Sequence, residues 1–135
     1  MHILIVEDSS FQRRNLQNIL ISARYTVSEA EDGNAALAYL ENAIDQQPDV
    51  ILLDLLMPGM DGFELLGILA EKYATIPTIV VTSDIQVTSK QQCTAKGARD
   101  VINKPVKAPQ LLKAIKKILD SVEEQPIHEL GNAQS

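Results

Sequence analysis

Short apolar runs alternate with longer amphipathic stretches along most of this chain, and this alternation restricts the folds open to it. The apolar runs predict strands over residues 2–6, 25–29, 50–53, 76–81 and 100–102. The stretches that follow them predict helices over residues 11–22, 35–44, 61–73, 86–96 and 109–122. A strand-then-helix order repeated five times implies an α/β fold, with a parallel sheet covered by helices on both faces.

The length of 135 residues is enough for one domain with a sizeable core. We expect this domain to span residues 1–122. After Val122 the sequence becomes mostly polar and includes Pro126 and Gly131, so we expect a flexible tail over residues 123–135. A docking peptide or the stub of a linker is the alternative interpretation of this segment.

Composition excludes several classes of function. The net charge of −6 argues against direct nucleic-acid binding, because phosphate contacts need clustered Lys and Arg. Lys113, Lys116 and Lys117 lie on one predicted helix, where they indicate a solvated face. The apolar runs are far shorter than the roughly 20 residues of a membrane helix, so we expect no membrane insertion. Cys93 is the only cysteine, which excludes an internal disulfide and favours a cytoplasmic location.

Polar and charged residues follow four of the five predicted strands. The carboxyl ends of parallel strands meet at one edge of a sheet, which is where ligands bind in open α/β folds. The residues expected at that edge are Glu7 and Asp8 after the first strand, Asp54 after the third, Thr82, Ser83 and Asp84 after the fourth, and Asn103, Lys104 and Pro105 after the fifth.

The three carboxylates at this edge need neutralisation. Two like charges about 4 Å apart repel by roughly 4 kcal/mol at an effective dielectric constant near 20. Lys104 supplies one positive charge, and the remaining deficit suits a divalent cation. Ligands that are all oxygen atoms favour Mg²⁺ or Mn²⁺ over zinc. A phosphoryl group could then sit between the ion, Lys104, the Thr82 hydroxyl and the Ser83 backbone N–H.

The motifs that carry these residues cover residues 3–9 (ILIVEDS), 53–62 (LDLLMPGMDG), 80–83 (VVTS), 97–98 (GA) and 104–105 (KP). Together they resemble the receiver domain of bacterial two-component response regulators. The resemblance implies a flavodoxin-like doubly wound sheet of five parallel strands in the order 2-1-3-4-5. No output domain follows in the sequence, so the chain resembles the stand-alone, chemotaxis-type regulators.

The resemblance also implies a role for each residue at this edge. Asp54 becomes the phosphoacceptor, and Glu7, Asp8, Asp54 and the backbone carbonyl of Leu56 become metal ligands. Thr82 becomes the hydroxyl that moves toward the phosphoryl group, and Lys104 becomes its ion partner. Such a domain catalyses only its own phosphorylation and dephosphorylation, so we do not expect a turnover enzyme.

Two features depart from the family pattern. Receivers usually carry Tyr or Phe three residues before the lysine, and here that position is Val101. The two positions that tune dephosphorylation in the family are Leu56 and Asp84 in this chain. Leu56 cannot orient an attacking water by hydrogen bonding, so we predict a long-lived phosphoryl group unless a separate phosphatase supplies the missing group.

The resemblance implies two classes of partner. A sensor histidine kinase or a phosphotransfer protein would donate the phosphoryl group, and a downstream target would bind the face made by the fourth helix, the fifth strand and the fifth helix. We expect a monomer or a phosphorylation-dependent dimer. Residues 85–89 form helix poorly, so the start of the fourth helix is expected to shift easily on phosphorylation.

Three alternative functions fit the sequence less well. A Mg²⁺-dependent phosphatase with an aspartyl intermediate commonly has a second aspartate at the position of Leu56. A flavodoxin needs a Gly-rich or hydroxyl-rich loop after the first strand, which this sequence lacks. A receiver that docks without accepting phosphate would not need the intact acidic set.

Overall fold

The computed structural model describes residues 1–57, 59–83 and 90–134, with side chains described as far as Ser121. The strands in these residues are β1 (His2–Val6), β2 (Thr26–Ala30), β3 (Val50–Leu53), β4 (Thr78–Thr82) and β5 (Asp100–Asn103). The helices are α1 (Ser10–Ser22), α2 (Gly33–Asn42), α3 (Gly62–Lys72), α4 (Lys90–Ala95) and α5 (Ala108–Gln134). Asp84 and the segment 85–89, with its predicted helix start, lie outside the described residues.

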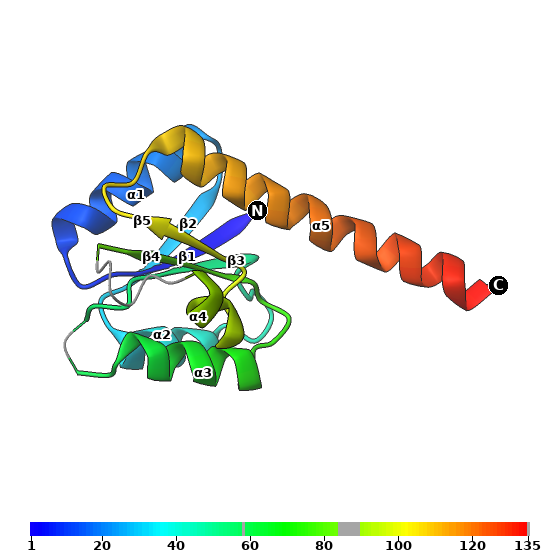
Figure 1. The fold of residues 1–135 in the computed structure, drawn as a ribbon, viewed down its shortest axis with the longest axis horizontal. Coiled ribbons are helices and arrows are strands. Elements are labelled where there is room, and N and C mark those ends of the chain that lie inside the picture. Colours follow the sequence, from blue (N-terminus) through cyan, green and yellow to red (C-terminus); the bar gives the residue numbers. More distant parts are fainter. Residues whose placement is uncertain (58, 84–89, 135) are drawn as a thin grey trace.

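All neighbouring strands pair in parallel, in the order β2-β1-β3-β4-β5. Helices α1 and α5 cover one face of this sheet, and α2, α3 and α4 cover the other (Figure 1). This arrangement is the predicted flavodoxin-like doubly wound fold. Its strand order reverses between β1 and β3, so the carboxyl ends of these two strands lie next to the expected binding crevice.

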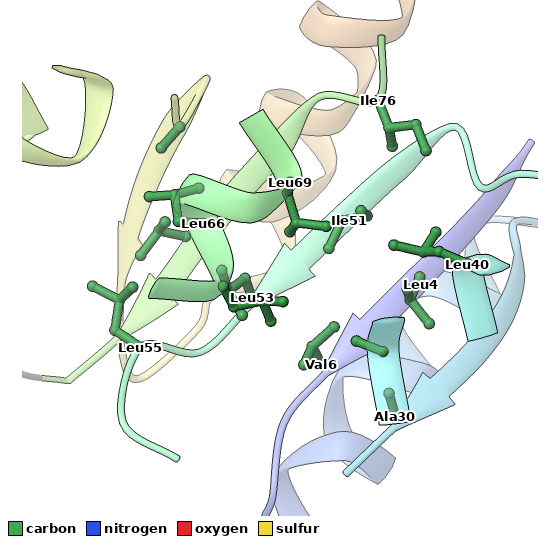
Figure 2. Packing of buried hydrophobic residues seen from close by; sticks show 14 of the residues in the cluster. Leu4, Val6, Ala30, Leu40, Ile51, Leu53, Leu55, Leu66, Leu69 and Ile76 are labelled. Carbon is green, nitrogen blue, oxygen red and sulfur yellow. The ribbon is translucent and has the colours of Figure 1, made fainter. Parts of the chain in front are cut away.

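The core consists of two apolar clusters, one on each face of the sheet. In the cluster on the α2–α3–α4 side, Leu66 and Leu69 of α3 share a cluster with Ile51 and Leu53 of β3, while Leu40 of α2 packs over β1 (Figure 2). Full burial of one such side chain contributes about 1.5–3 kcal/mol. The central strand β3 is buried along its whole length, which explains why its sequence is apolar without alternation.

Side chains cap three of the helices at their amino ends. Ser9 accepts a hydrogen bond from the backbone N–H of Gln12 at 3.2 Å and thereby begins α1. Asp32 caps α2 in the same way, and Asp61 accepts from the N–H of Phe63 at 3.0 Å to begin α3. The acceptor in each case satisfies an N–H group that has no partner within the helix.

Several predicted bounds differ from the observed ones: α2 begins and ends two residues earlier than predicted, and β4 and α5 need correction for identifiable reasons. Strand β4 begins at Thr78 rather than residue 76, because Ile76 donates its N–H to Tyr73 within a turn and Pro77 has no N–H to give. Helix α5 continues to Gln134, past the predicted end at Val122, and its last turns project away from the domain (Figure 1). The residues after Val122 begin with Glu-Glu-Gln, which have high helix propensity despite their polarity. The division into a domain and a flexible tail stays a prediction.

Candidate functional site

The sheet positions three of the predicted site residues directly. The N–H of Glu7 donates to Ala30 O, and the N–H of Asp54 donates to Val6 O, both at 3.0 Å. The N–H of Lys104 donates to Thr82 O, also at 3.0 Å. Each residue therefore continues the hydrogen-bond ladder one step beyond its strand, which fixes its backbone at the carboxyl edge of the sheet.

The carboxylates of Glu7, Asp8 and Asp54 form one cluster, in which an oxygen from each lies within 4.8 Å of the others. Glu7 and Asp54 are buried, with 2% and 5% of their surfaces exposed, whereas Asp8 is exposed. Lys104 Nζ lies 2.6 Å from Glu7 Oε1 and 3.4 Å from Asp54 Oδ2. The structure thus brings together the three acids and the lysine that the sequence placed at this edge.

Two contacts between described residues hold the chain close to the end of β3. The Asp54 Oδ1 atom accepts a hydrogen bond from the N–H of Leu56 at 3.1 Å, which orients the carboxylate. At the start of α3, a Cβ atom on Gly62 would lie 2.4 Å from the Leu55 Cα atom. Only glycine permits this approach, so Gly62 allows α3 to begin close to the strand that carries Asp54.

The cluster carries more negative than positive charge. Three carboxylates against one ammonium leave a formal charge of −2. Partial desolvation raises the pKa of Asp8 above its ordinary value of 3.8, and the hydrogen bond to Glu7 and the charge of Glu7 raise it further. A backbone hydrogen bond and the charge of Lys104 oppose this change. Glu7, Asp8 and Asp54 could hold a metal ion, whose charge would offset this surplus negative charge.

The carboxylates fit a hexacoordinate ion of the size of Mg²⁺. Oxygens bound to one such ion at about 2.1 Å lie at most about 4.2 Å apart. The 4.8 Å spread of the cluster therefore requires only a small rotation of one carboxylate. The donor set is all oxygen, which matches the chemistry predicted for Mg²⁺ or Mn²⁺.

Two hydroxyl residues from the end of β4 complete the edge. Thr82 is fully buried at the last position of the strand, and Ser83 follows it on the surface. Ser83 and Lys104 line a cavity of about 390 Å³ that extends along α1 past Gln12 to Phe11. The cavity leaves room beside Lys104 for a group that approaches from solvent.

Most of the sequence matches the model of a known protein family. Residues 3–116 match the family model of the response regulator receiver domain. This chain belongs to the response regulator receiver domain family. It is therefore a receiver domain of two-component signalling, a family that implies a kinase partner and whose members are not conventional enzymes.

Known proteins of similar size resemble this receiver domain over nearly their full length. Protein PilH of Pseudomonas aeruginosa is 39% identical over 119 residues, which cover 87% of this chain and 96% of PilH. A CheY-like receiver from Methanospirillum hungatei has a TM-score of 0.84 at 31% identity, with 92% of this chain and 97% of that chain covered. The chemotaxis protein CheY4 of Vibrio cholerae has a TM-score of 0.77 at 32% identity, covering 87% and 97%.

Three further residues were predicted to affect switching or dephosphorylation. Val101 lies half-buried in β5, paired with Val80 of β4, so the family's usual aromatic side chain is absent from this strand. Leu56 is 48% exposed at the rim of the cluster. Asp84 lies outside the described residues. The assignment of individual roles to these residues stays a prediction.

One side chain that contacts the site, Arg13, was not predicted from the sequence. Arg13 of α1 donates hydrogen bonds to the carbonyl oxygens of Glu7 and Asp8. An arginine at the end of the first turn of a helix usually faces solvent, and only its spacing of five residues from Asp8 could have indicated this contact. In the part of the chain that the structure describes, no helix is long and apolar enough to cross a membrane.

Proposed function

We propose that this receiver domain is a phosphoacceptor switch, in which Asp54 takes a phosphoryl group from a phosphohistidine on a sensor histidine kinase or a phosphotransfer protein. A carboxylate oxygen of Asp54 bonds to phosphorus while the phosphorus–nitrogen bond of the donor breaks, and the imidazole leaves and takes up a proton. The observation that carries the proposal is the cluster of three carboxylates beside Lys104, which together carry a formal charge of −2.

Glu7, Asp8, Asp54 and the carbonyl of Leu56 are the residues we assign to Mg²⁺ or Mn²⁺. The bound ion supplies positive charge that offsets the charge on the phosphoryl oxygens. Asp54 Oδ1 is held by the Leu56 N–H, so its other oxygen, Oδ2, faces Lys104 and is the better placed nucleophile.

Lys104, Thr82 and Ser83 are the residues we assign to the phosphoryl group itself. Lys104 Nζ already lies within 3.4 Å of Asp54 Oδ2, so its ammonium can pair with an oxygen of the group transferred there. The Thr82 hydroxyl and the Ser83 N–H come from the neighbouring strand end and can bind the other oxygens. These contacts replace the water that a transferring phosphoryl group would otherwise keep.

The experiment that tests this function is incubation with acetyl phosphate and Mg²⁺, followed by intact mass measurement. We expect a gain of one phosphoryl mass, about 80 Da, that is absent without metal and absent in Asp54→Asn. Asp61→Asn is a matched control, because Asp61 is exposed outside the cluster and asparagine also caps helices. No mass gain in the wild-type protein, or an equal gain in Asp54→Asn, would contradict the proposal and favour a receiver that only docks.

The lifetime of the phosphoryl group follows from Leu56. Its exposed side chain has no group that can orient a water molecule for attack, so we predict slow hydrolysis and dependence on a separate phosphatase. We expect Leu56→Asn to shorten the lifetime by several-fold, which is less than the factor of about 10²–10⁴ contributed by proton-transfer groups, because an amide orients the water without taking its proton. Loss of most of the label within seconds in the wild type, with no acceleration in the variant, would show that the prediction is wrong.

We further propose that the downstream target binds the α4–β5–α5 face. A pocket of about 310 Å³ opens there, lined by Val101 and by three lysines on its rim, Lys90, Lys113 and Lys117. With a smaller residue at Val101, this face cannot use an inward-turning aromatic ring to signal. Hydrogen exchange with a beryllofluoride adduct should change in β5 and α5, and unchanged protection there would contradict this assignment.

The cellular setting is also a proposal. We propose a cytoplasmic protein without direct nucleic-acid contact, monomeric or dimeric only when phosphorylated, because the sequence has a single cysteine and a net charge of −6. Light scattering with and without beryllofluoride measures the mass directly. A stable dimer in the untreated protein would contradict the oligomeric state.

A further inference from the structure

Arg13 connects helix α1 to the loop that carries two of the three clustered carboxylates. Its Nη1 atom donates to Glu7 O at 2.7 Å and to Asp8 O at 3.1 Å. Its Nε atom lies 3.7 Å from Glu29 Oε1 on β2. Only 18% of the Arg13 side chain is exposed, so the guanidinium is largely enclosed by these contacts.

The two carbonyl groups that Arg13 contacts belong to consecutive peptide units. One unit joins Glu7 to Asp8 and the other joins Asp8 to Ser9, so they lie on either side of the Asp8 Cα atom. A peptide unit is planar, and holding both units therefore fixes the backbone dihedrals of Asp8. The direction of the Asp8 Cα–Cβ bond, from which the carboxylate projects, follows from the orientation of those two units.

Asp8 needs such support more than the other two acids. Glu7 and Asp54 are buried and paired with Lys104. Asp8 is exposed, and among the described residues it forms no salt bridge. Its carboxylate also faces the negative charge of Glu7, which favours orientations that point away from the cluster. The backbone contacts from Arg13 therefore oppose this repulsion.

We propose that Arg13 is a positioning residue of the metal site, which holds the loop after β1 so that the Asp8 carboxylate stays with Glu7 and Asp54. The inference rests on the metal site of the proposed function. Arg13 touches neither the cluster oxygens nor Asp54 in the described contacts, so its effect is carried through the backbone of Glu7 and Asp8. Groups that orient metal ligands in this way typically change metal affinity by about 10–100-fold.

The positive charge of Arg13 allows its positioning role to be distinguished from a purely electrostatic effect on Mg²⁺ affinity. A positive charge near a cation site repels the cation, so its removal should tighten Mg²⁺ binding if electrostatics alone mattered. Positioning predicts the opposite result, because a released loop binds Mg²⁺ more weakly. The sign of the change in affinity therefore separates the two effects.

The test is calorimetric titration of the full chain with Mg²⁺, with Arg13→Gln, Arg13→Lys and a control variant. Arg14→Gln is the matched control, because Arg14 is the adjacent arginine on α1 and is exposed. We expect Arg13→Gln to bind Mg²⁺ roughly 10-fold more weakly, and Arg14→Gln to bind as tightly as wild type or slightly more tightly. Arg13→Lys keeps the charge but loses the planar fork, so we expect an intermediate affinity.

A second readout separates positioning from general loss of structure. In Arg13→Gln the rate of phosphorylation by acetyl phosphate should approach the wild-type rate at saturating Mg²⁺, with only the Mg²⁺ concentration at half-maximal rate raised. Unchanged or tighter Mg²⁺ binding in folded Arg13→Gln would overturn the proposal. If that variant does not fold, wild-type affinity in Arg13→Lys overturns it instead. Absence of Mg²⁺ uptake by the wild-type protein would contradict the proposed function, which is a separate outcome.

Discussion

The two ends of the parallel sheet carry polar clusters that are built in opposite ways. Near the amino ends of β1 and β2, the ring of His2 contacts the hydroxyl groups of Thr26 and Ser28 at 2.7 Å and of Tyr39 at 3.1 Å. These partners carry no charge, and they satisfy one another. At the carboxyl end, three carboxylates face one ammonium and a charge of −2 remains.

The cluster at the amino end is explained by the stability of the fold, whereas the cluster at the carboxyl end is better explained by a function. Uncharged hydroxyl groups need no ion from outside the chain, and removing one of them costs about one hydrogen bond. A cluster with surplus charge has a higher free energy until a cation joins it, so its sequence is poorly explained by stability alone. We therefore expect substitutions at the two ends to respond differently to Mg²⁺.

The largest effect is expected when the positive charge of Lys104, at the carboxyl end of the sheet, is removed. Lys104→Gln leaves Glu7 and Asp54 without their ion partner, and breaking a buried ion pair costs about 3–5 kcal/mol. We expect urea unfolding to show a loss near the lower limit, about 3 kcal/mol, without metal. Added Mg²⁺ should stabilise the variant more than the wild type, because it replaces the lost charge.

Lys107→Gln is the control for this variant, because Lys107 is exposed on the following loop. It should change the free energy of unfolding by less than about 0.5 kcal/mol. A loss in Lys104→Gln that matches the control, or one that Mg²⁺ does not reduce, would contradict the comparison.

A smaller effect is expected at the amino end. Tyr39→Phe removes a hydroxyl that contacts both His2 and Ser28, while those two residues keep their own contact. We expect a loss of about 1 kcal/mol in the free energy of unfolding, with the same value in the presence and absence of Mg²⁺. A change in Mg²⁺ affinity, measured by calorimetry, would show that the two ends are not independent.

The smallest effect is expected for Asp8→Asn and has the opposite sign. The pKa of Asp8 is raised in the folded protein, so its contribution to stability is present below pH 3.8 and is lost as the pH rises through the raised pKa. At pH 7 the charged form slightly destabilises the metal-free protein. We expect Asp8→Asn to raise the free energy of unfolding by about 0.3 kcal/mol at this pH, because Asp8 is exposed and screened.

The gain in Asp8→Asn should shrink as the pH is lowered from 7 to about 4, because wild-type Asp8 takes up a proton as the pH falls through its raised pKa. Urea unfolding at both pH values measures this dependence. Added Mg²⁺ should reverse the order of the two proteins, because the variant lacks one metal ligand. A variant that is less stable than wild type at pH 7 without metal would contradict the charge surplus.

The sequence predicted most of the fold because the apolar runs mark the strands directly. The bounds of β1 and β3 were predicted correctly, since both are buried and bounded by charged residues or a proline-containing turn. The start of β4 was predicted too early because Ile76 and Pro77 are apolar but lie in the turn before the strand. The end of α5 was placed too early because polar composition was taken as the end of a helix.

At the site, the sequence predicted the members but not all of their contacts. Residues that follow strands were brought together because a parallel sheet places those positions on one edge. The contact of Arg13 with two backbone carbonyls depends on the rotamer of a long side chain, which spacing alone does not determine. The hydrogen bonds of His2 depend on a strand register that the sequence does not specify.

Calorimetric titration of the wild-type protein with Mg²⁺ at neutral pH tests the surplus of negative charge most directly. We predict uptake of one ion per chain, competed by Mn²⁺ and weakened in Asp54→Asn. Absence of uptake of either ion by the folded protein would contradict the account.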